Sequence, residues 1–123
     1  MKKMRFDVKC VREFLWENGI VFSVRGYDYG EVGYVWVFGN GNVYLRKRLG
    51  KIVSKNQLVK FVKWSGFENV DDWWNQIRVF VKEGRDMWLY RVDFVCEADN
   101  FVDDGIIRSD YELWDREAGI SGR

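Results

Sequence analysis

The sequence predicts one α+β domain in which about five strands close into a small barrel or a strongly bent sheet, with two or three helices packed against it. A chain of 123 residues has the length of a single domain. The Gly-Asn-Gly-Asn sequence at residues 39–42 lies between two apolar segments and indicates a tight antiparallel hairpin. Helical spacing of apolar residues recurs on both sides of this hairpin, so helices and strands are mixed along the chain.

The first half of the chain contains one predicted helix and most of the predicted strands. Apolar residues at helical spacing predict a helix that begins near Val8 and is ended by Gly19. Residues 20–25 form an apolar, β-branched run that is typical of a buried strand, and residues 26–33 resemble a loop with exposed aromatic rings. Further strands are expected at residues 34–38 and 43–49, followed by a turn at Gly50 and a fourth strand from residue 51.

The second half contains two more predicted helices and a last strand. Ser54 is placed to cap a short helix that Gly66 ends. Asn69 precedes a longer helix whose apolar stripe continues to Val81. Residues 87–95 alternate well enough to be the last strand. The order is therefore a helix, three or four strands, two helices and a long strand.

Charge is distributed unevenly along the chain. Residues 1–96, which we assign to the domain, carry seventeen Lys or Arg against eleven Asp or Glu, whereas residues 97–123 carry three against eight. In this acidic C-terminal extension, a Ser-Asp-Tyr-Glu sequence resembles a capping box and predicts a short helix over residues 110–118. A basic domain suits an anionic partner, and the extension could cover or compete for the basic surface. The alternative is an extension that only aids solubility.

The residue types that are missing exclude several function classes. The chain has no His, Thr or Pro. Without His it lacks the commonest general base, Ser-His-Asp and Cys-His nucleophiles, and the usual zinc sites. The composition therefore favours a binding module over an enzyme, and we expect no cofactor and no metal.

The sequence also bears on cellular location. No apolar run approaches the roughly 18 to 20 residues that cross a bilayer, so no membrane partner is expected. Charges recur through the first twelve residues, which is unlike a signal peptide. We therefore expect an intracellular, cytoplasmic protein. Cys10 and Cys96 are expected to be buried reduced thiols, with a disulfide between them as the alternative.

Two groups of residues are candidates for binding nucleic acid. The first is Arg25 with Tyr27 and Tyr29, because a guanidinium can fork onto phosphate and phenol rings can stack on bases. The alternative is that both rings pack on the sheet and Arg25 pairs with a nearby carboxylate. The second is Arg46 and Arg48, which share one face of a strand and are followed by Lys51. The alternative for this group is a solvated, charge-protected edge strand.

Other candidates lie near the predicted second helix. Trp64 precedes a Gly-containing turn and could stack on a base, while Trp36, Trp73, Trp74 and Trp88 lie inside regular elements and are expected in the core. Lysines at positions 55, 60 and 63 could extend the basic surface. Glu68, Asp71 and Asp72 could in principle hold Mg²⁺, but their position at a helix start explains them without a metal.

Four segments of the chain form a recognisable set. Phe14 and Leu15 lead through Gly19 to a strand that ends in Ser-Val-Arg, and residues 64–73 contain Gly-Phe, a short spacer, an acidic pair and Trp. Together with residues 30–38 and 87–94, which are similar to a second and a closing strand, they resemble the ASCH domains of the PUA-like superfamily. The resemblance covers about residues 8–94 and leaves the acidic extension outside.

The resemblance implies a PUA-like barrel with helices at its openings and a cleft for RNA or a nucleotide. One branch of the family consists of small amidohydrolases that act on N4-acetylcytidine with a Lys, a Thr and a Glu. Aligning Arg25 with the strand-ending Arg of that branch places Ile20 at the Lys and Ser23 at the Thr. Ser could supply the hydroxyl, but Ile cannot replace a Lys. The resemblance thus supports the fold and weakens the enzyme interpretation.

We therefore predict a non-catalytic module that binds RNA or single-stranded nucleic acid, with no prediction of its oligomeric state. The predicted binding residues are Arg25, Tyr27, Tyr29, Arg46, Arg48, Lys51 and Trp64. The alternative is a small hydrolase, either a nucleoside amidohydrolase or a ribonuclease, that uses Ser23, Arg25, Tyr27 and Glu68. A further alternative is a protein-interaction module or a homodimer.

Overall fold

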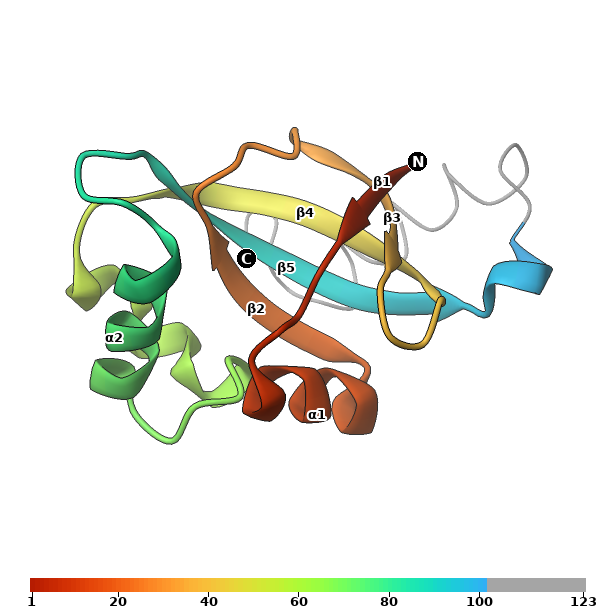
Figure 1. Ribbon diagram of the computed structural model, residues 1–123, viewed down its shortest axis with the longest axis horizontal. Coiled ribbons are helices and arrows are strands. Elements are labelled where there is room, and N and C mark those ends of the chain that lie inside the picture. Colours follow the sequence, from red (N-terminus) through yellow and green to blue (C-terminus); the bar gives the residue numbers. More distant parts are fainter. Residues whose placement is uncertain (102–123) are drawn as a thin grey trace.

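Figure 1 shows the computed structural model of the chain, which describes residues 1–101. The predicted helix over residues 110–118 lies outside the described residues. The elements in chain order are β1 (Lys2–Met4), α1 (Lys9–Asn18), β2 (Ile20–Arg25), β3 (Val32–Val37), β4 (Val43–Ile52), the 3₁₀ helix η1 (Lys55–Trp64), α2 (Val70–Phe80), β5 (Met87–Cys96) and the short 3₁₀ helix η2 (Ala98–Asn100).

The five strands form one mixed sheet in the order β1-β3-β4-β5-β2. β1 pairs with β3 in parallel, and the other neighbours are antiparallel. The α+β class is therefore confirmed. Within the described residues β1 and β2 are the two edges of the sheet, so hydrogen bonding does not close it into the expected barrel. Met4 of β1 and Val21 of β2 instead belong to the same core as Val11 of α1, and α1 follows β1 and packs beside β2 (Figure 1).

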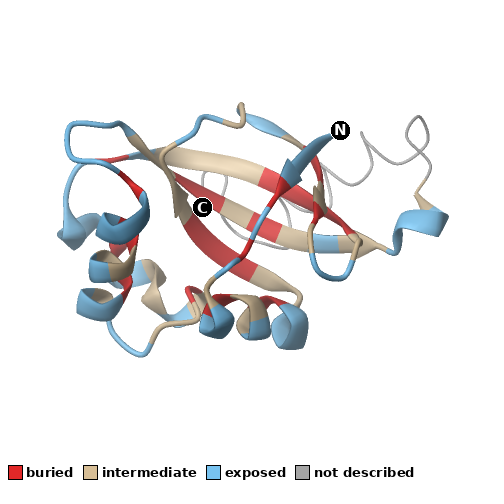
Figure 2. Cartoon of the chain, viewed as in Figure 1, coloured by how far each residue is buried: buried red, intermediate tan, exposed pale blue. Residues whose placement is uncertain are grey.

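Neighbouring residues of β2 and β5 pack into two different cores, as strand alternation requires. On one side, which we call the α1 face, Val21 and Tyr90 belong to the core that includes α1. On the other side, the α2 face, Phe22 and Leu89 belong to the core formed with η1 and α2. Figure 2 shows the buried stretches along the strands and the exposed outer sides of the helices.

Local signals fix the ends of the helices. Gly19 adopts a left-handed conformation (φ 70°) and donates its N–H to the Leu15 carbonyl at 2.8 Å, which ends α1 as predicted. The side chain of Asn69 accepts from the Asp72 N–H at 2.8 Å and caps α2, also as predicted. Ser54 caps η1, whose hydrogen bonding is of the 3₁₀ type rather than the expected α type.

Several expectations are corrected by the structure. β4 runs unbroken from Val43 to Ile52, so Gly50 is not a turn between two strands. The shift in β4–β5 register between Arg48 and Gly50 shows that the chain absorbs an extra residue there as a β-bulge. β1 and η2 were not expected, because each has only three residues and neither has a periodic pattern. Of the four tryptophans assigned to the core, Trp73 is fully buried, and the other three are partly exposed.

Two further expectations concern cysteines and membranes. Cys10 and Cys96, both in the described part of the chain, are not joined by a disulfide. Cys10 is exposed on α1, which contradicts its expected burial, because it lies on the side of the helix that faces away from the sheet. None of the helices in residues 1–101 is long and apolar enough to cross a bilayer.

Gly66 offers a test of how closely α1 packs against the turn after η1. A methyl group at Gly66 (φ 88°) would lie 2.9 Å from the Val11 Cα and 3.0 Å from the Cys10 carbonyl oxygen. Gly84 has a similar φ of 83° but nothing within 4 Å. We expect Gly84→Ala to lower the free energy of unfolding by about 1–2 kcal/mol, through left-handed backbone strain alone. Gly66→Ala should cost about 1–3 kcal/mol more, through overpacking.

Urea unfolding followed by tryptophan fluorescence measures both variants. Equal losses of stability in the two variants would contradict the tight contact between this turn and α1.

Candidate functional site

Three basic side chains come together at one end of the α1 face. The register of the sheet places Arg25 of β2 opposite Trp88 of β5, and Trp88 opposite Lys51 of β4. The neighbouring row places Tyr90 opposite Arg48. Three strands that are far apart in the sequence therefore bring Arg25, Arg48 and Lys51 around one half-buried tryptophan.

The β-bulge at Leu49 is what puts Arg48 and Lys51 on the same face. Residues three apart on a regular strand point to opposite faces. The extra residue in the bulge shifts the alternation by one position, so Lys51 points to the same face as Arg48. The Arg48 guanidinium carbon lies 5.0 Å, and the Lys51 Nζ 5.7 Å, from the centroid of the Trp88 ring. Each cation also contacts a carboxylate, Arg48 with Asp28 at 2.7 Å and Lys51 with Asp86 at 3.0 Å.

The loop after β2 folds over this face and is anchored there by the hydroxyl of Tyr90. This side chain has no exposed surface. Its hydroxyl accepts a hydrogen bond from the Tyr29 N–H at 2.6 Å and donates one to the Asp28 Oδ1 at 3.0 Å. The same Asp28 oxygen accepts from the Gly30 N–H at 2.9 Å, an Asx turn that shapes the loop. Burial of the hydroxyl raises the pKa of Tyr90 to about 12.

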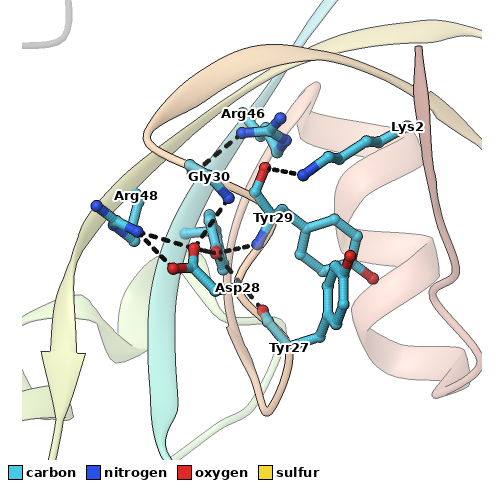
Figure 3. Close-up of polar contacts among 8 residues, drawn as sticks. Lys2, Tyr27, Asp28, Tyr29, Gly30, Arg46 and Arg48 are labelled. Atoms are coloured by element: carbon cyan, nitrogen blue, oxygen red, sulfur yellow. Dashed lines mark hydrogen bonds and ion pairs between the residues drawn. The ribbon is translucent and has the colours of Figure 1, made fainter.

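Two basic side chains support the loop from beneath and beside it. Arg46 is 5% exposed and donates to the Gly30 carbonyl at 3.1 Å. Gly33 leaves room for it, since a Cβ there would lie 2.9 Å from an Arg46 nitrogen. Lys2 donates to the Tyr29 carbonyl at 2.8 Å (Figure 3). Arg46 therefore holds the loop and does not present its guanidinium to solvent, unlike the surface contact expected for it.

The two tyrosines of the loop have different environments. Tyr27 is 61% exposed, whereas Tyr29 is half-buried and packs edge-on against Tyr90 at a centroid distance of 5.6 Å. The two loop rings also contact each other edge-on at 4.9 Å, and the Lys2 Nζ lies 5.9 Å from the Tyr27 centroid. Only Tyr27 offers a largely open ring, which stands at the rim of the site (Figure 3).

Arg25 lies at the junction of the loop and a cleft. Its Nε donates to the Ser23 Oγ at 2.9 Å, and its guanidinium carbon lies 4.6 Å from the centroid of the Phe6 ring. Burial lowers the pKa of Arg25, against opposing effects of Tyr29 and Asp7. The cleft has a volume of about 180 Å³ and lies between α1, β2 and α2. Its lining includes Arg5, Phe6, Ser23, Arg25, Gln76 and Phe80.

One wall of this cleft is the unpaired edge of the sheet. Gly19 accepts a hydrogen bond from the Phe94 N–H across the β2–β5 pair, so every second residue from Gly19 onward bonds to β5. Phe22 and Val24 therefore direct their N–H and C=O groups away from β5, and both residues line the cleft. Adjacent main-chain donors and acceptors of this kind can bind the edge of a planar polar ring.

Other predicted residues lie outside this group. Trp64 stacks on Phe22 at 5.3 Å in the core of the α2 face, and the Lys63 Nζ lies 4.1 Å from its ring centroid. Trp64 is thus part of the packing behind the sheet. Lys55, on η1 behind the sheet, is paired with Asp71 at 2.6 Å.

Of the four residues considered for catalysis, two line the same cleft and two lie elsewhere. Ser23 and Arg25 line the cleft, but Tyr27 and Glu68 do not. Within residues 1–101, no three His, Cys, Asp or Glu side chains are placed to hold a metal ion. Asp72, one of the acidic residues considered for Mg²⁺, instead accepts a hydrogen bond from the Asn69 side chain.

Lys2, Asp28 and Tyr90 belong to the site but were not selected from the sequence. Asp28 lies two residues before Gly30, which is the spacing of an Asx turn and could have predicted the loop conformation. Lys2 and Tyr90 are separated from Tyr29, their partner in the loop, by 27 and 61 positions in the sequence. No local pattern predicts such contacts.

The pKa of Tyr90 gives a test of the anchor. The folded state keeps the phenol protonated up to a pH of about 12, whereas an unfolded tyrosine loses its proton near 10. The stabilisation from this group is therefore complete below pH 10 and is lost as the pH rises from 10 towards 12. Tyr90→Phe should cost about 1–3 kcal/mol at pH 8, because the Tyr29 N–H loses its acceptor.

Urea unfolding of both proteins at several pH values checks this. The difference in unfolding free energy between the wild type and Tyr90→Phe should shrink between pH 10 and 12. A difference that stays constant up to pH 12 would contradict the anchoring role.

Comparison of this chain with family models, with curated proteins and with solved structures finds no match.

Proposed function

We propose that this protein binds RNA or another single-stranded nucleic acid on the α1 face, without catalysing a reaction. The observation that carries the proposal is the alignment of Arg25, Trp88 and Lys51 across three strands, with Arg48 in the next row. Phosphate contacts provide most of the affinity of such complexes, and clustered cations on one surface are their electrostatic signature.

Arg48 and Lys51 are the phosphate-binding side chains in this proposal. Both are partly exposed, with 27% and 48% of their side-chain surfaces accessible. Both already lie over the Trp88 ring, which restricts their rotamers before a ligand arrives. Arg46 is omitted because it is buried under the loop, and Trp64 because it packs on the other face.

The open ring of Tyr27 and the cleft beside Arg25 accept bases in this proposal. Stacking on an exposed aromatic ring tolerates any base. The cleft volume of about 180 Å³ is below the usual range for drug-sized ligands, roughly 300–1,000 Å³, and suits a single planar ring. The guanidinium of Arg25 and the free main-chain edge of Phe22 and Val24 would contact the polar rim of that ring.

We also propose that the sheet is an open member of the PUA-like group. The order of elements, a helix before β2, a hairpin, two helices and a closing strand, supports this assignment. A cleft beside the strand-ending Arg25 supports it further. The edge strands β1 and β2 would then be the two strands that pair in a closed barrel. Here they do not pair directly, and both instead share a core with α1.

Salt dependence distinguishes phosphate contacts from stacking. We expect Lys51→Ala to weaken binding of a fluorescein-labelled 12-nucleotide RNA and to reduce the slope of log K against log salt by about 0.7, the value for one phosphate on a single strand. Tyr27→Ala should weaken the binding free energy by about 1–3 kcal/mol, through loss of stacking, and leave the salt slope unchanged. Fluorescence anisotropy between 50 and about 300 mM KCl measures both quantities.

Lys9→Ala serves as the matched control, since Lys9 is an exposed lysine of α1 whose ion-pair partner within residues 1–101 is Glu13, at 3.7 Å. It should change neither affinity nor slope appreciably. Affinity that does not vary with salt, or equal effects of Lys9→Ala and Lys51→Ala, would overturn the proposed function.

A further inference from the structure

We propose that Asp28 is an internal counter-ion that controls phosphate binding at Arg48. In the free protein the Asp28 carboxylate occupies the place on Arg48 that a phosphate would take, and a nucleic acid must draw Arg48 away from it. This inference rests on the proposed function and adds a residue that limits the affinity of the same site.

The ion pair is compact but accessible. Both carboxylate oxygens of Asp28 accept from the same Arg48 nitrogen, Nη1, at 2.8 and 2.7 Å. Asp28 has 42% and Arg48 27% of its side-chain surface exposed, so an incoming ligand can reach the pair. The other guanidinium nitrogens of Arg48 have no hydrogen-bond partner within residues 1–101 and offer a phosphate a first point of contact.

The carboxylate stays where it is when Arg48 leaves it. Its Oδ1 accepts from the Gly30 N–H at 2.9 Å and from the Tyr90 hydroxyl at 3.0 Å, and neither contact involves Arg48. The Gly30 N–H holds the pKa of Asp28 below its usual value, with help from Arg48 and Tyr90. A phosphate bound at Arg48 would therefore lie next to a fixed negative charge, and that repulsion lowers affinity.

The two carboxylate oxygens are not equivalent, which makes a selective substitution possible. Oδ1 bonds to the Gly30 N–H and the Tyr90 hydroxyl as well as to Arg48, whereas Oδ2, within residues 1–101, contacts Arg48 alone, at 2.7 Å. Asp28→Asn keeps an oxygen at Oδ1 for Gly30 and Tyr90 and removes the charge. The loop should therefore keep its conformation while Arg48 loses its counter-ion.

The same loop provides a matched control. Glu31 is exposed, and its side chain makes no ion pair within the described residues. The Glu31 carbonyl accepts from the Arg48 N–H at 2.7 Å, a main-chain contact that Glu31→Gln keeps, so this substitution removes the same charge from the same loop without removing a partner of the Arg48 guanidinium. The effect of a general change in charge can thus be separated from the release of Arg48.

The test is the affinity of the labelled 12-nucleotide RNA for the wild type, Asp28→Asn and Glu31→Gln, measured by anisotropy as a function of salt. We expect Asp28→Asn to bind about two- to fivefold more tightly at 150 mM KCl, consistent with the strength of one partly exposed ion pair. Its salt slope should be steeper by up to about 0.7. Glu31→Gln should change the affinity less than about twofold.

A double-mutant cycle with Arg48→Gln decides the mechanism. The gain from Asp28→Asn should disappear when Arg48 is absent. A gain that persists without Arg48, equal effects of Asp28→Asn and Glu31→Gln, or weaker binding by Asp28→Asn would each overturn the inference. Hydrogen exchange at the Tyr29 and Gly30 amides verifies that the loop is intact in Asp28→Asn. If it is not, Asp28→Ser, which keeps a side-chain oxygen for the Gly30 N–H but carries no charge, should bind more tightly in its place.

The outcome for the wild type separates this inference from the proposed function. Salt-sensitive binding by the wild type without a gain in Asp28→Asn overturns only the role of Asp28. No binding by any variant at 50 mM KCl overturns the proposed function, and this inference with it.

Discussion

The site depends on one buried hydroxyl group. Tyr90 lies in the middle of the sheet with no exposed surface, and a buried hydroxyl is costly unless it is hydrogen-bonded. The loop between β2 and β3 meets this requirement from above, because the Tyr29 N–H and the Asp28 carboxylate both bond to it. The position of the loop, and hence of the open Tyr27 ring, follows from the need to satisfy a group in the core.

Much of the fold could be predicted because its signals are local. The Gly19 and Asn69 caps and the hairpin at residues 39–42 depend on neighbours within four residues. The open sheet could not be predicted in the same way. It depends on how side chains of α1, β1 and β2 fill one common core, which is a matter of side-chain volume in three dimensions. β1 in addition has only three residues, too few for a strand pattern to emerge.

The candidate site likewise combines features that local sequence predicts with features that depend on tertiary packing. Arg25 and Tyr27 lie where the sequence suggests, at the end of a strand and in the loop that follows. Arg46 and Arg48 share a face, as alternation predicts, yet one is buried under the loop and the other is partly exposed. The difference arises because Gly30 and Gly33 lie directly over Arg46. Lys51 joins the face only through the bulge at Leu49, and a strand sequence alone does not show which residue a bulge will absorb.

Neutralised cations change how such a surface selects its ligand. Arg48 and Lys51 are both paired with carboxylates that the fold supplies, Asp28 and Asp86. Long-range attraction of polyanions is then weak, because each pair is nearly neutral beyond a Debye length of about 8 Å. In the proposed function, recognition would then come from contacts at short range. Arg25 differs from both, since within the described residues it has no carboxylate in hydrogen-bond contact and stacks on Phe6 at the cleft. The cation without a directly bonded carboxylate therefore lies next to the cleft, where Asp7 offsets part of its charge through space. In the proposed function a ligand would have to fit the cleft in shape before it reached this guanidinium.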